Sequence, residues 1–302
     1  MSDLSVSVAG IKMKNPVLSA SGTFGSGKEY ASIFDVGRMG GLVTKGLTLK
    51  PRSGNTPPRL CETPAGLLNA VGLQNPGADA FIRDVLPEML AFGVPVIANI
   101  AGSTKDEYVQ LAERFSGTGV AALEVNISCP NVQTGGMALG TVPQVAARVV
   151  EGVAGATDLP VIVKLTPNVT DIVELAQAVT AAGAGALSLI NTLLGMVIDV
   201  RQRKPLLGNV VGGLSGPAIR PVAVRAVWQV ARAVEIPVIG IGGICSGEDA
   251  LQFILAGASA VAVGSAFFQD PLAALKVIEE LDEYCREQGV DRLRDLVGAA
   301  WK

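Results

Sequence analysis

Apolar residues along the chain gather into eight short runs rather than into long continuous stretches. Each run is rich in β-branched residues or has the length of a strand that is buried on both faces of a parallel sheet. We therefore predict eight buried strands. They are expected within residues 15–21, 41–46, 94–100, 122–128, 160–166, 186–192, 237–243 and 260–266.

Amphipathic patterns with helical spacing lie between most of these runs. The clearest span residues 104–115, 142–156, 170–183, 217–234 and 246–257. Thr170 and Ser246 are predicted N-caps, and Gly183 and Gly257 are predicted helix stops.

The alternation of strands and helices predicts an α/β fold of the (β/α)8, or TIM-barrel, type. A doubly wound open sheet is the alternative, but the glycine-rich residues 21–27 do not have the GxGxxG spacing of that fold. We see no linker or shift in composition, so residues 1–302 are predicted to form one domain.

Three segments fall outside the strand–helix alternation. Residues 4–15 are predicted to form a hairpin that plugs the bottom of the barrel. The connections after the second and sixth strands, residues 47–75 and 193–216, are long. Long loops in a compact domain are usually functional.

Almost every predicted strand finishes on an amide, a lysine, a hydroxyl or a glycine pair, where barrel enzymes carry their active sites. One such residue is often only a turn residue or a cap, but the repetition around the ring favours a site. These residues are Ser21, Lys45, Asn99, Asn126, Lys164, Asn191, Thr192, Gly242, Gly243, Gly264 and Ser265.

The glycines after strands seven and eight indicate a phosphate site, because exposed backbone N–H groups there precede helices. A phosphate, several amides and two lysines that need an anion suit a phosphorylated planar cofactor such as FMN. Alternatively, Lys45 or Lys164 forms a Schiff base, as in a barrel aldolase.

Composition excludes several other classes. The net charge is −3 without a basic cluster, which argues against binding to nucleic acid. The four cysteines form no CxxC pair, so neither a metal site nor an iron–sulfur cluster is expected in this chain. The uncharged residues 175–198 and 250–269 contain glycines and are predicted to be helix, turn and buried strand rather than membrane spans. We see no signal peptide and expect a cytoplasmic protein.

A series of motifs, from NPVLSASGTFG through TKGLTLKPRSGNTPPR, NAVGLQNPG, EVNISCPN, VKLTPN, LINT, GGLSGPAIRP and GIGGI to VGSAF, covers nearly the whole chain. In these motifs the sequence resembles the dihydroorotate dehydrogenases, flavin enzymes of pyrimidine biosynthesis. The cysteine of NISCPN resembles the soluble class 1 enzymes, and the opening VSVAGIKMKNPVLSASGTFGSG is similar to the NAD-linked class 1B.

The resemblance implies an FMN-binding barrel with the following contacts. FMN would be held by Ser21, Lys45, Gly46, Asn99, Asn126, Lys164, Ile190, Gly216, Gly242, Gly243, Gly264 and Ser265. The substrate would be held by Lys45, Asn69, Ala70, Val71, Gly72, Leu73, Asn126, Asn131, Asn191 and Thr192.

The resemblance also makes Cys129 the catalytic base, which suits a chain without histidine. A free thiol has a pKa of about 8.5, so modest tuning suffices for proton transfer. Pro130 keeps the backbone of Cys129 extended, and the glycine-rich residues 131–140 are expected to close over the substrate. Glu124 ranks low as an alternative base, and Cys61, Cys245 and Cys285 are expected to be inert.

The resemblance to class 1B further implies a homodimer that joins an electron-transfer subunit carrying FAD and a [2Fe–2S] cluster in a heterotetramer. That subunit would pass electrons to NAD+. The alternatives are a fumarate-linked class 1A homodimer, a flavin enzyme for another dihydropyrimidine or for tRNA dihydrouridine, and the Schiff-base aldolase.

Overall fold

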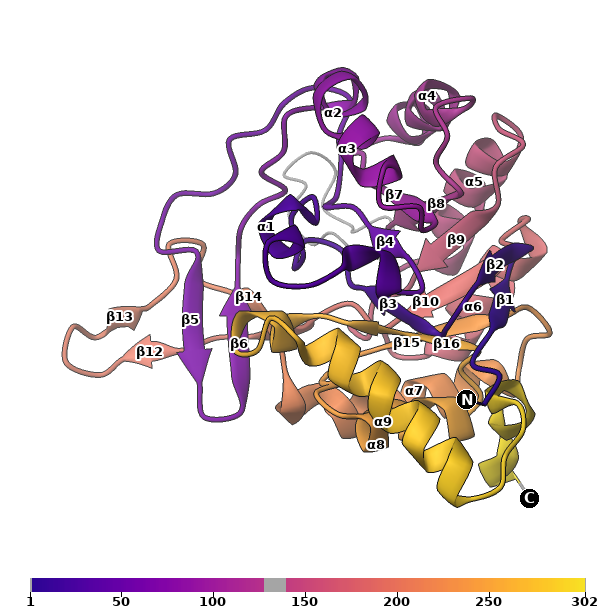
Figure 1. The fold of residues 1–302 in the computed structure, drawn as a ribbon. Helices are drawn as coiled ribbons and strands as arrows, with labels where there is room; N and C mark the ends of the chain where they lie inside the picture. Colours follow the sequence, from indigo (N-terminus) through magenta and orange to yellow (C-terminus); the bar gives the residue numbers. More distant parts are fainter. Residues whose placement is uncertain (1, 128–139, 302) are drawn as a thin grey trace.

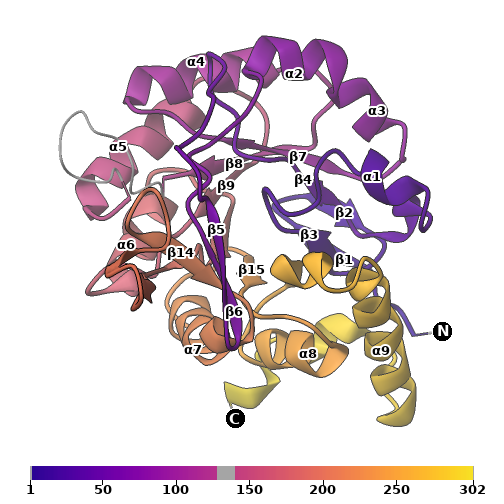
Figure 2. The same cartoon turned by 90° about the vertical axis from the view of Figure 1, so that its left-hand side faces the viewer.

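A computed structural model describes residues 2–127 and 140–301, and its centre is a closed barrel of eight parallel strands (Figure 1; Figure 2). Its order around the barrel is β3-β16-β15-β10-β9-β8-β7-β4. The strands are β3 (Val17–Ser19), β4 (Leu42–Val43), β7 (Val96–Ile100), β8 (Ala122–Asn126), β9 (Val161–Lys164), β10 (Ala186–Leu189), β15 (Val238–Ile241) and β16 (Ala260–Val263). Each lies in a predicted run, which confirms the fold class.

The barrel closes between its first two strands. Leu18 in β3 and Gly41, just before β4, form a parallel bridge, and the Ser19 amide donates to the Gly41 carbonyl at 3.2 Å. The Val43 amide donates to Ser19 Oγ at 3.0 Å. The backbone pairing between these strands is a single bridge, and the hydrogen bond to the Ser19 hydroxyl adds to it to close the barrel.

Helices surround the barrel, and each predicted helical pattern contains one. They are α1 (Lys28–Ala31), α2 (Ala78–Asp84), α3 (Leu86–Leu90), α4 (Lys105–Phe115), α5 (Pro143–Ala154), α6 (Ile172–Ala181), α7 (Arg220–Ala231), α8 (Gly247–Leu255) and α9 (Ala273–Glu287). None of the helices within residues 2–127 and 140–301 has the length and apolar character needed to cross a bilayer.

The predicted helix ends are right in three cases and wrong in one. Ser246 caps α8 by accepting from the Asp249 amide at 3.2 Å. Gly183 and Gly257 have φ angles of +104° and +116°, which stop helices readily. Thr170 is not the cap of α6, because Asp171 is the residue that precedes the helix and accepts from the amides of Val173 and Glu174.

The predicted N-terminal hairpin consists of β1 (Val6–Val8) and β2 (Ile11–Met13), which pair antiparallel. Alternate side chains are buried in each strand. The buried ones pack in a cluster with Ala122, Ala186 and Ala260, the first residues of three barrel strands. The hairpin therefore plugs the amino-terminal end of the barrel, as predicted.

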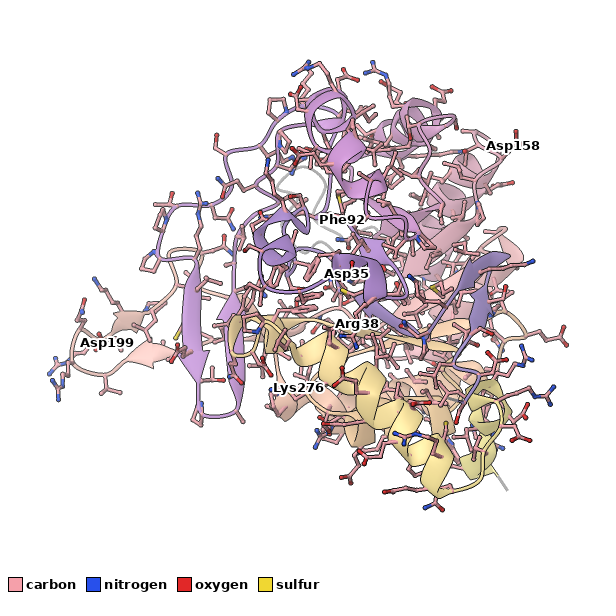
Figure 3. All side chains as sticks on the ribbon, viewed as in Figure 1. Asp35, Arg38, Phe92, Asp158, Asp199 and Lys276 are labelled. Atoms are coloured by element: carbon pink, nitrogen blue, oxygen red, sulfur yellow. The ribbon has the colours of Figure 1, made fainter. Side chains whose placement is uncertain are left out.

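The two long connections form a second sheet instead of irregular loops. Its antiparallel order is β11-β14-β6-β5, and it stands to one side of the barrel in Figure 1. Its strands are β5 (Leu60–Thr63), β6 (Gly66–Asn69), β11 (Leu193–Gly195) and β14 (Gly212–Ser215). A ribbon of β12 (Ile198–Asp199) and β13 (Lys204–Pro205) extends from it, with Asp199 near the outer edge of the molecule (Figure 3).

Candidate active site

The carboxyl ends of three neighbouring strands hold three of the predicted polar residues on two successive levels of the sheet. Asn126 pairs with Lys164 across β8 and β9, and Asn99 pairs with Glu124 across β7 and β8. All four residues are buried. Since parallel pairing fixes the relative height of these residues, their side chains meet at one end of the barrel.

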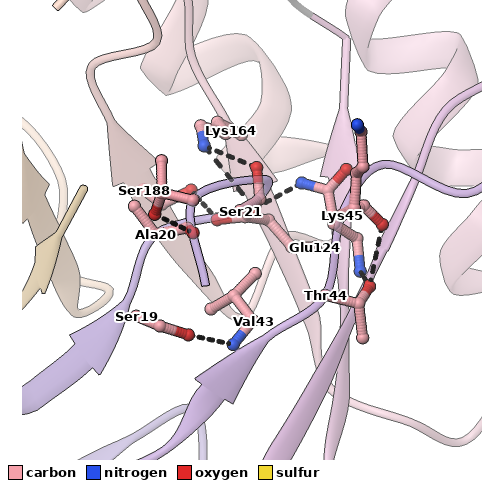
Figure 4. Close-up of polar contacts among 11 residues, drawn as sticks. Ser19, Ala20, Ser21, Val43, Thr44, Lys45, Glu124, Lys164 and Ser188 are labelled. Atoms are coloured by element: carbon pink, nitrogen blue, oxygen red, sulfur yellow. Dashed lines mark hydrogen bonds and ion pairs between the residues drawn. The ribbon is translucent and has the colours of Figure 1, made fainter. Parts of the chain in front are cut away.

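The buried carboxylate of Glu124 links side chains from three neighbouring strands (Figure 4). Glu124 Oε2 accepts from Asn99 Nδ2 and lies 3.8 Å from Lys164 Nζ, while its Oε1 accepts from Ser188 Oγ at 2.7 Å. Lys164 Nζ also donates to Ser21 Oγ at 3.2 Å. The anion that a buried lysine requires is therefore supplied, for Lys164, by the protein itself.

Sequence reasoning missed this role of Glu124. A signal was present, because Glu124 is two residues from Asn126 and strand side chains alternate, so the two share a face. Ser188 gave no signal, since its relation to Glu124 depends on strands that are distant in the sequence.

Asn99 presents one unsatisfied atom at this end of the barrel. Its Nδ2 is used by Glu124, and its Oδ1 is the buried side-chain oxygen or nitrogen that finds no hydrogen-bond partner within the described residues. A Cβ at Gly46 would lie 3.1 Å from this oxygen and 2.9 Å from Leu73 Cδ2. Glycine at position 46 thus leaves space beside an acceptor that needs a donor.

Lys45 follows β4 and is half-buried next to Gly22. Burial lowers the pKa of its ammonium group, and the nearby charge of Arg59 lowers it further. Within the described residues Lys45 makes no ion pair. An anionic ligand at this position would stabilise the charged form of Lys45, which burial and Arg59 disfavour.

The second sheet brings two distant parts of the predicted substrate site together. Asn69, at the end of β6, pairs with Gly213 of β14 and donates to its carbonyl at 3.2 Å. A Cβ at Gly213 would collide with Thr192 Oγ1, so Thr192 lies directly over that glycine. Ala70 to Leu73 continue from β6, and Leu73 reaches Gly46.

Asn168 is a further residue that the sequence reasoning did not single out. Its Nδ2 donates to the Thr192 carbonyl at 3.0 Å, and its Oδ1 accepts from the Leu194 amide at 2.9 Å. The Asn191 amide donates to the Leu165 carbonyl at 2.9 Å. Residues 191–194 are therefore held against the end of β9, and the VKLTPN motif contained the signal in its last residue.

The predicted phosphate-binding glycines form a separate group. A Cβ at Gly243 would lie 2.6 Å from the Gly216 carbonyl oxygen, and one at Gly216 would lie 2.7 Å from Gly66 Cα. Both have positive φ angles, +69° and +98°. A Cβ at Gly264 would meet only side-chain atoms, Ala20 Cβ at 3.5 Å and Thr23 Cγ2 at 3.9 Å, so no other backbone segment approaches it on that side.

Comparison with known proteins identifies the family to which this chain belongs. The family model described as dihydroorotate dehydrogenase matches residues 3–285. This chain belongs to the dihydroorotate dehydrogenase family. It is 62% identical over 296 residues, 98% of this chain and 96% of the relative, to a protein of Desulforudis audaxviator. It is 56% identical over 298 residues, 98% of each chain, to one of Geotalea uraniireducens. Both relatives are named dihydroorotate dehydrogenase B (NAD(+)), catalytic subunit.

Membership of the dihydroorotate dehydrogenase family confirms the resemblance inferred from the motifs and supports class 1B over class 1A and over a barrel aldolase. The family implies FMN, and the residues present fit it. Asn99 Oδ1, which has no partner among the described residues, suits a ring N–H, and the Lys164 ammonium suits an electron-rich ring edge. The glycine backbone at Gly264, at the start of a short helix, suits a phosphate.

The remaining residues predicted to contact FMN also follow strands of the barrel. Ile190 is buried after β10, and its amide donates to the Ile241 carbonyl at 3.0 Å. Gly242 follows β15 with a φ angle of +138°, and Ser265 begins a short 3-10 helix, η3 (Ser265–Phe268). Their contacts with FMN stay predictions.

Cys129, Asn131 and the proposed closing segment 131–140 lie, except for Gly140, outside the described residues. The flanks of the segment meet, because a Cβ at Gly140 would lie 2.4 Å from the Ile127 carbonyl oxygen at the end of β8. Cys285 is buried, and burial raises the pKa of its thiol, whereas Cys245 is exposed. The expectation that Cys61, Cys245 and Cys285 are inert stays a prediction.

Proposed function

We propose that this chain is the catalytic subunit of an NAD-linked dihydroorotate dehydrogenase, which oxidises (S)-dihydroorotate to orotate in pyrimidine biosynthesis. The observation that carries the proposal is the near full-length similarity to relatives named as catalytic subunits of this enzyme. The buried Asn99, Asn126 and Lys164 and the half-buried Lys45 at the carboxyl ends of the strands supply a suitable chemistry for it.

Substrate binding uses complementary polar groups. Dihydroorotate is a ring of alternating amide groups with one carboxylate, and asparagine side chains offer a donor and an acceptor together. We assign the ring to Asn69, Asn126, Asn131 and Asn191, with Thr192 beside them. Lys45 balances the carboxylate, which matches its half-buried position without an ion pair among the described residues.

Oxidation removes a proton from C5 and a hydride from C6 of the substrate. We assign Cys129 as the base that takes the C5 proton, with its sulfur as the accepting atom. FMN, when bound, supplies the acceptor for the hydride. Lys164 and Asn99 would hold the ring of FMN, and residues 131–140 would keep water away from the thiol when the substrate is bound.

The first test is a visible absorption spectrum of the purified protein, followed by anaerobic addition of dihydroorotate. Bound FMN should give a yellow protein that bleaches when the substrate is added. Cys129→Ser should slow bleaching by orders of magnitude near neutral pH while orotate still binds. Cys61→Ser is the matched control and should bleach at the normal rate. A colourless protein, or normal bleaching by Cys129→Ser, would contradict the respective assignments.

We further propose a cytoplasmic homodimer that joins a subunit carrying FAD and a [2Fe–2S] cluster. The relatives' description as catalytic subunits supports a partner of some kind. We place the contact of the homodimer on the projecting segment 194–211, because it exposes several large apolar side chains, a feature of protein interfaces. They are Leu194, Met196, Ile198, Val200, Leu206, Val210 and Val211.

Reconstitution tests the partnership. The chain alone should reduce an artificial acceptor with dihydroorotate but not NAD+, and NAD+ reduction should appear when an FAD/[2Fe–2S] subunit is added. Light scattering should give a dimer for the chain alone, and Val200→Glu should shift it toward monomer, since Val200 is 81% exposed. Efficient fumarate reduction by the chain alone would instead indicate class 1A.

A further inference from the structure

Glu124 lies at the carboxyl end of the barrel, but the proposed function assigns it no contact with the substrate or with FMN. It is 3% exposed and joins four neighbouring strands, because β8 carries it and its partners Asn99, Lys164 and Ser188 lie on β7, β9 and β10. A buried carboxylate is costly, and an apolar side chain of similar size often gives equal or greater stability. Its contacts point to a purpose other than stability.

The first contact fixes the direction of an amide. Glu124 accepts from Asn99 Nδ2, so the acceptor Oδ1 of Asn99 is turned to the side where it has no partner among the described residues. Because a carboxylate only accepts, it holds this amide in one of its two orientations. A glutamine could serve either orientation.

The second contact concerns charge. Lys164 Nζ lies 3.8 Å from Glu124 Oε2, and both side chains are almost fully buried, so solvent screens the pair weakly. The pair has no net charge. Without the carboxylate, the net charge at this position would be one unit more positive next to the ring that Lys164 is proposed to contact.

We propose that Glu124 is a positioning residue that orients Asn99 and neutralises Lys164, and thereby sets the reduction potential of the bound flavin. The inference rests on the proposed function, since it requires FMN at Lys164. A reduced flavin is richer in electrons than an oxidised one, so a positive charge beside it favours reduction. Glu124 therefore keeps the potential lower than Lys164 alone would make it.

The test is the flavin midpoint potential of Glu124→Gln, measured against a redox dye. The potential should rise by an amount equal to at least a tenfold change in the oxidised-to-reduced equilibrium, about 30 mV for a two-electron couple. Ser188→Ala is the matched control, because it removes the 2.7 Å hydrogen bond to Glu124 Oε1 but keeps the charge. It should change the equilibrium less than threefold.

A potential in Glu124→Gln that is unchanged or lower overturns the inference, and so does an equal rise in Ser188→Ala. If Glu124→Gln does not fold, Glu124→Asp decides. That variant keeps the charge but withdraws it from Lys164, so the equilibrium should shift about threefold in the same direction, and no shift or an opposite one overturns the inference. A protein that holds no flavin would instead refute the proposed function.

Discussion

The two ends of the barrel are built from the same strands but differ sharply in chemistry. Along β8 the interior positions are Ala122, Glu124 and Asn126, and the first of these packs against the apolar hairpin. The same change occurs along β9, from Ile162 to Lys164, and along β10, from Ala186 to Ser188. Polarity therefore rises from the amino end to the carboxyl end within single strands.

Because of this gradient, one end of the barrel contributes mainly to the stability of the fold and the other mainly to ligand binding. The amino end is sealed by well-packed apolar side chains, which contribute to folding through burial. The carboxyl end contains buried amides and charges, which stabilise a fold poorly but bind polar ligands. The alternate positions Leu123 and Val125 point outward to the helices and belong to the main apolar core, so the gradient is confined to the interior.

The largest expected effect of a substitution on stability is at the amino end. Met13 is 3% exposed within the hairpin cluster, so Met13→Ala should lower the free energy of unfolding by about 3 kcal/mol through the cavity it leaves. Lys12→Ala, an exposed neighbour in β2, is the control and should have little effect. Chemical denaturation measures both, and flavin reduction by the folded Met13→Ala protein should stay normal. Slower reduction would show that the two ends are coupled.

At the carboxyl end the effect should fall on binding. Lys45→Met should weaken orotate binding about 10- to 100-fold, since a hydrogen bond to a charged group contributes about 1.5–3 kcal/mol. The melting temperature should not fall, because a half-buried cation is removed. Lys50→Met, an exposed lysine of the same connection, should bind orotate normally. If Lys45→Met lost stability but kept its affinity for orotate, the carboxyl end would contribute to folding rather than to binding.

The pH dependence of orotate binding gives a smaller and more specific effect. The pKa of Lys45 is lowered by burial and then by Arg59, so its positive charge disappears at a lower pH than that of an ordinary lysine. Affinity should therefore decline as pH rises through this lowered pKa. In the ligand-free protein the sign is opposite, because the unfolded state binds the extra proton and stability rises with pH over that range.

Lys45→Arg separates this effect from the other titrating groups, since an arginine keeps its charge. Titration calorimetry at increasing pH should show the decline in the wild type and a flat profile in Lys45→Arg. The same decline in both proteins would assign it to another group.

The smallest effect tests a purely structural residue near the carboxyl end. Asp171→Ala should lower the free energy of unfolding by about 1 kcal/mol, because the side chain caps α6. Thr170→Ala should have an effect within about 0.5 kcal/mol. Denaturation curves distinguish the two. A larger loss in Thr170→Ala would show that Thr170 is the cap of α6, as predicted from the sequence.

The barrel and the hairpin could be predicted because their signals are local. A run of β-branched residues identifies a buried strand, and alternation of apolar and polar residues identifies β1 and β2. The second sheet could not be predicted in this way. Its strands contain only three or four residues, two of them begin with glycine, and Asn69 and Gly213 pair across 144 positions of sequence.

The site divides in the same manner. Asn99, Asn126 and Lys164 could be found because they end strands, where such folds carry their chemistry. The link through Glu124 and Ser188 depends on which strands are neighbours, and pattern alone does not determine that. The assignment of Cys129 came from the family motif, and its role stays a prediction.

The sheet shared by the two long connections has a consequence for how such enzymes can change. In many barrels each loop can be exchanged without regard to the others, which makes the fold modular. Here β6 and β14 hydrogen-bond to one another, so residues 47–75 and 193–216 form a single inherited unit. A chimaera that receives one of them from a distant homologue should lose the register of both, and successful grafts should need the matched pair.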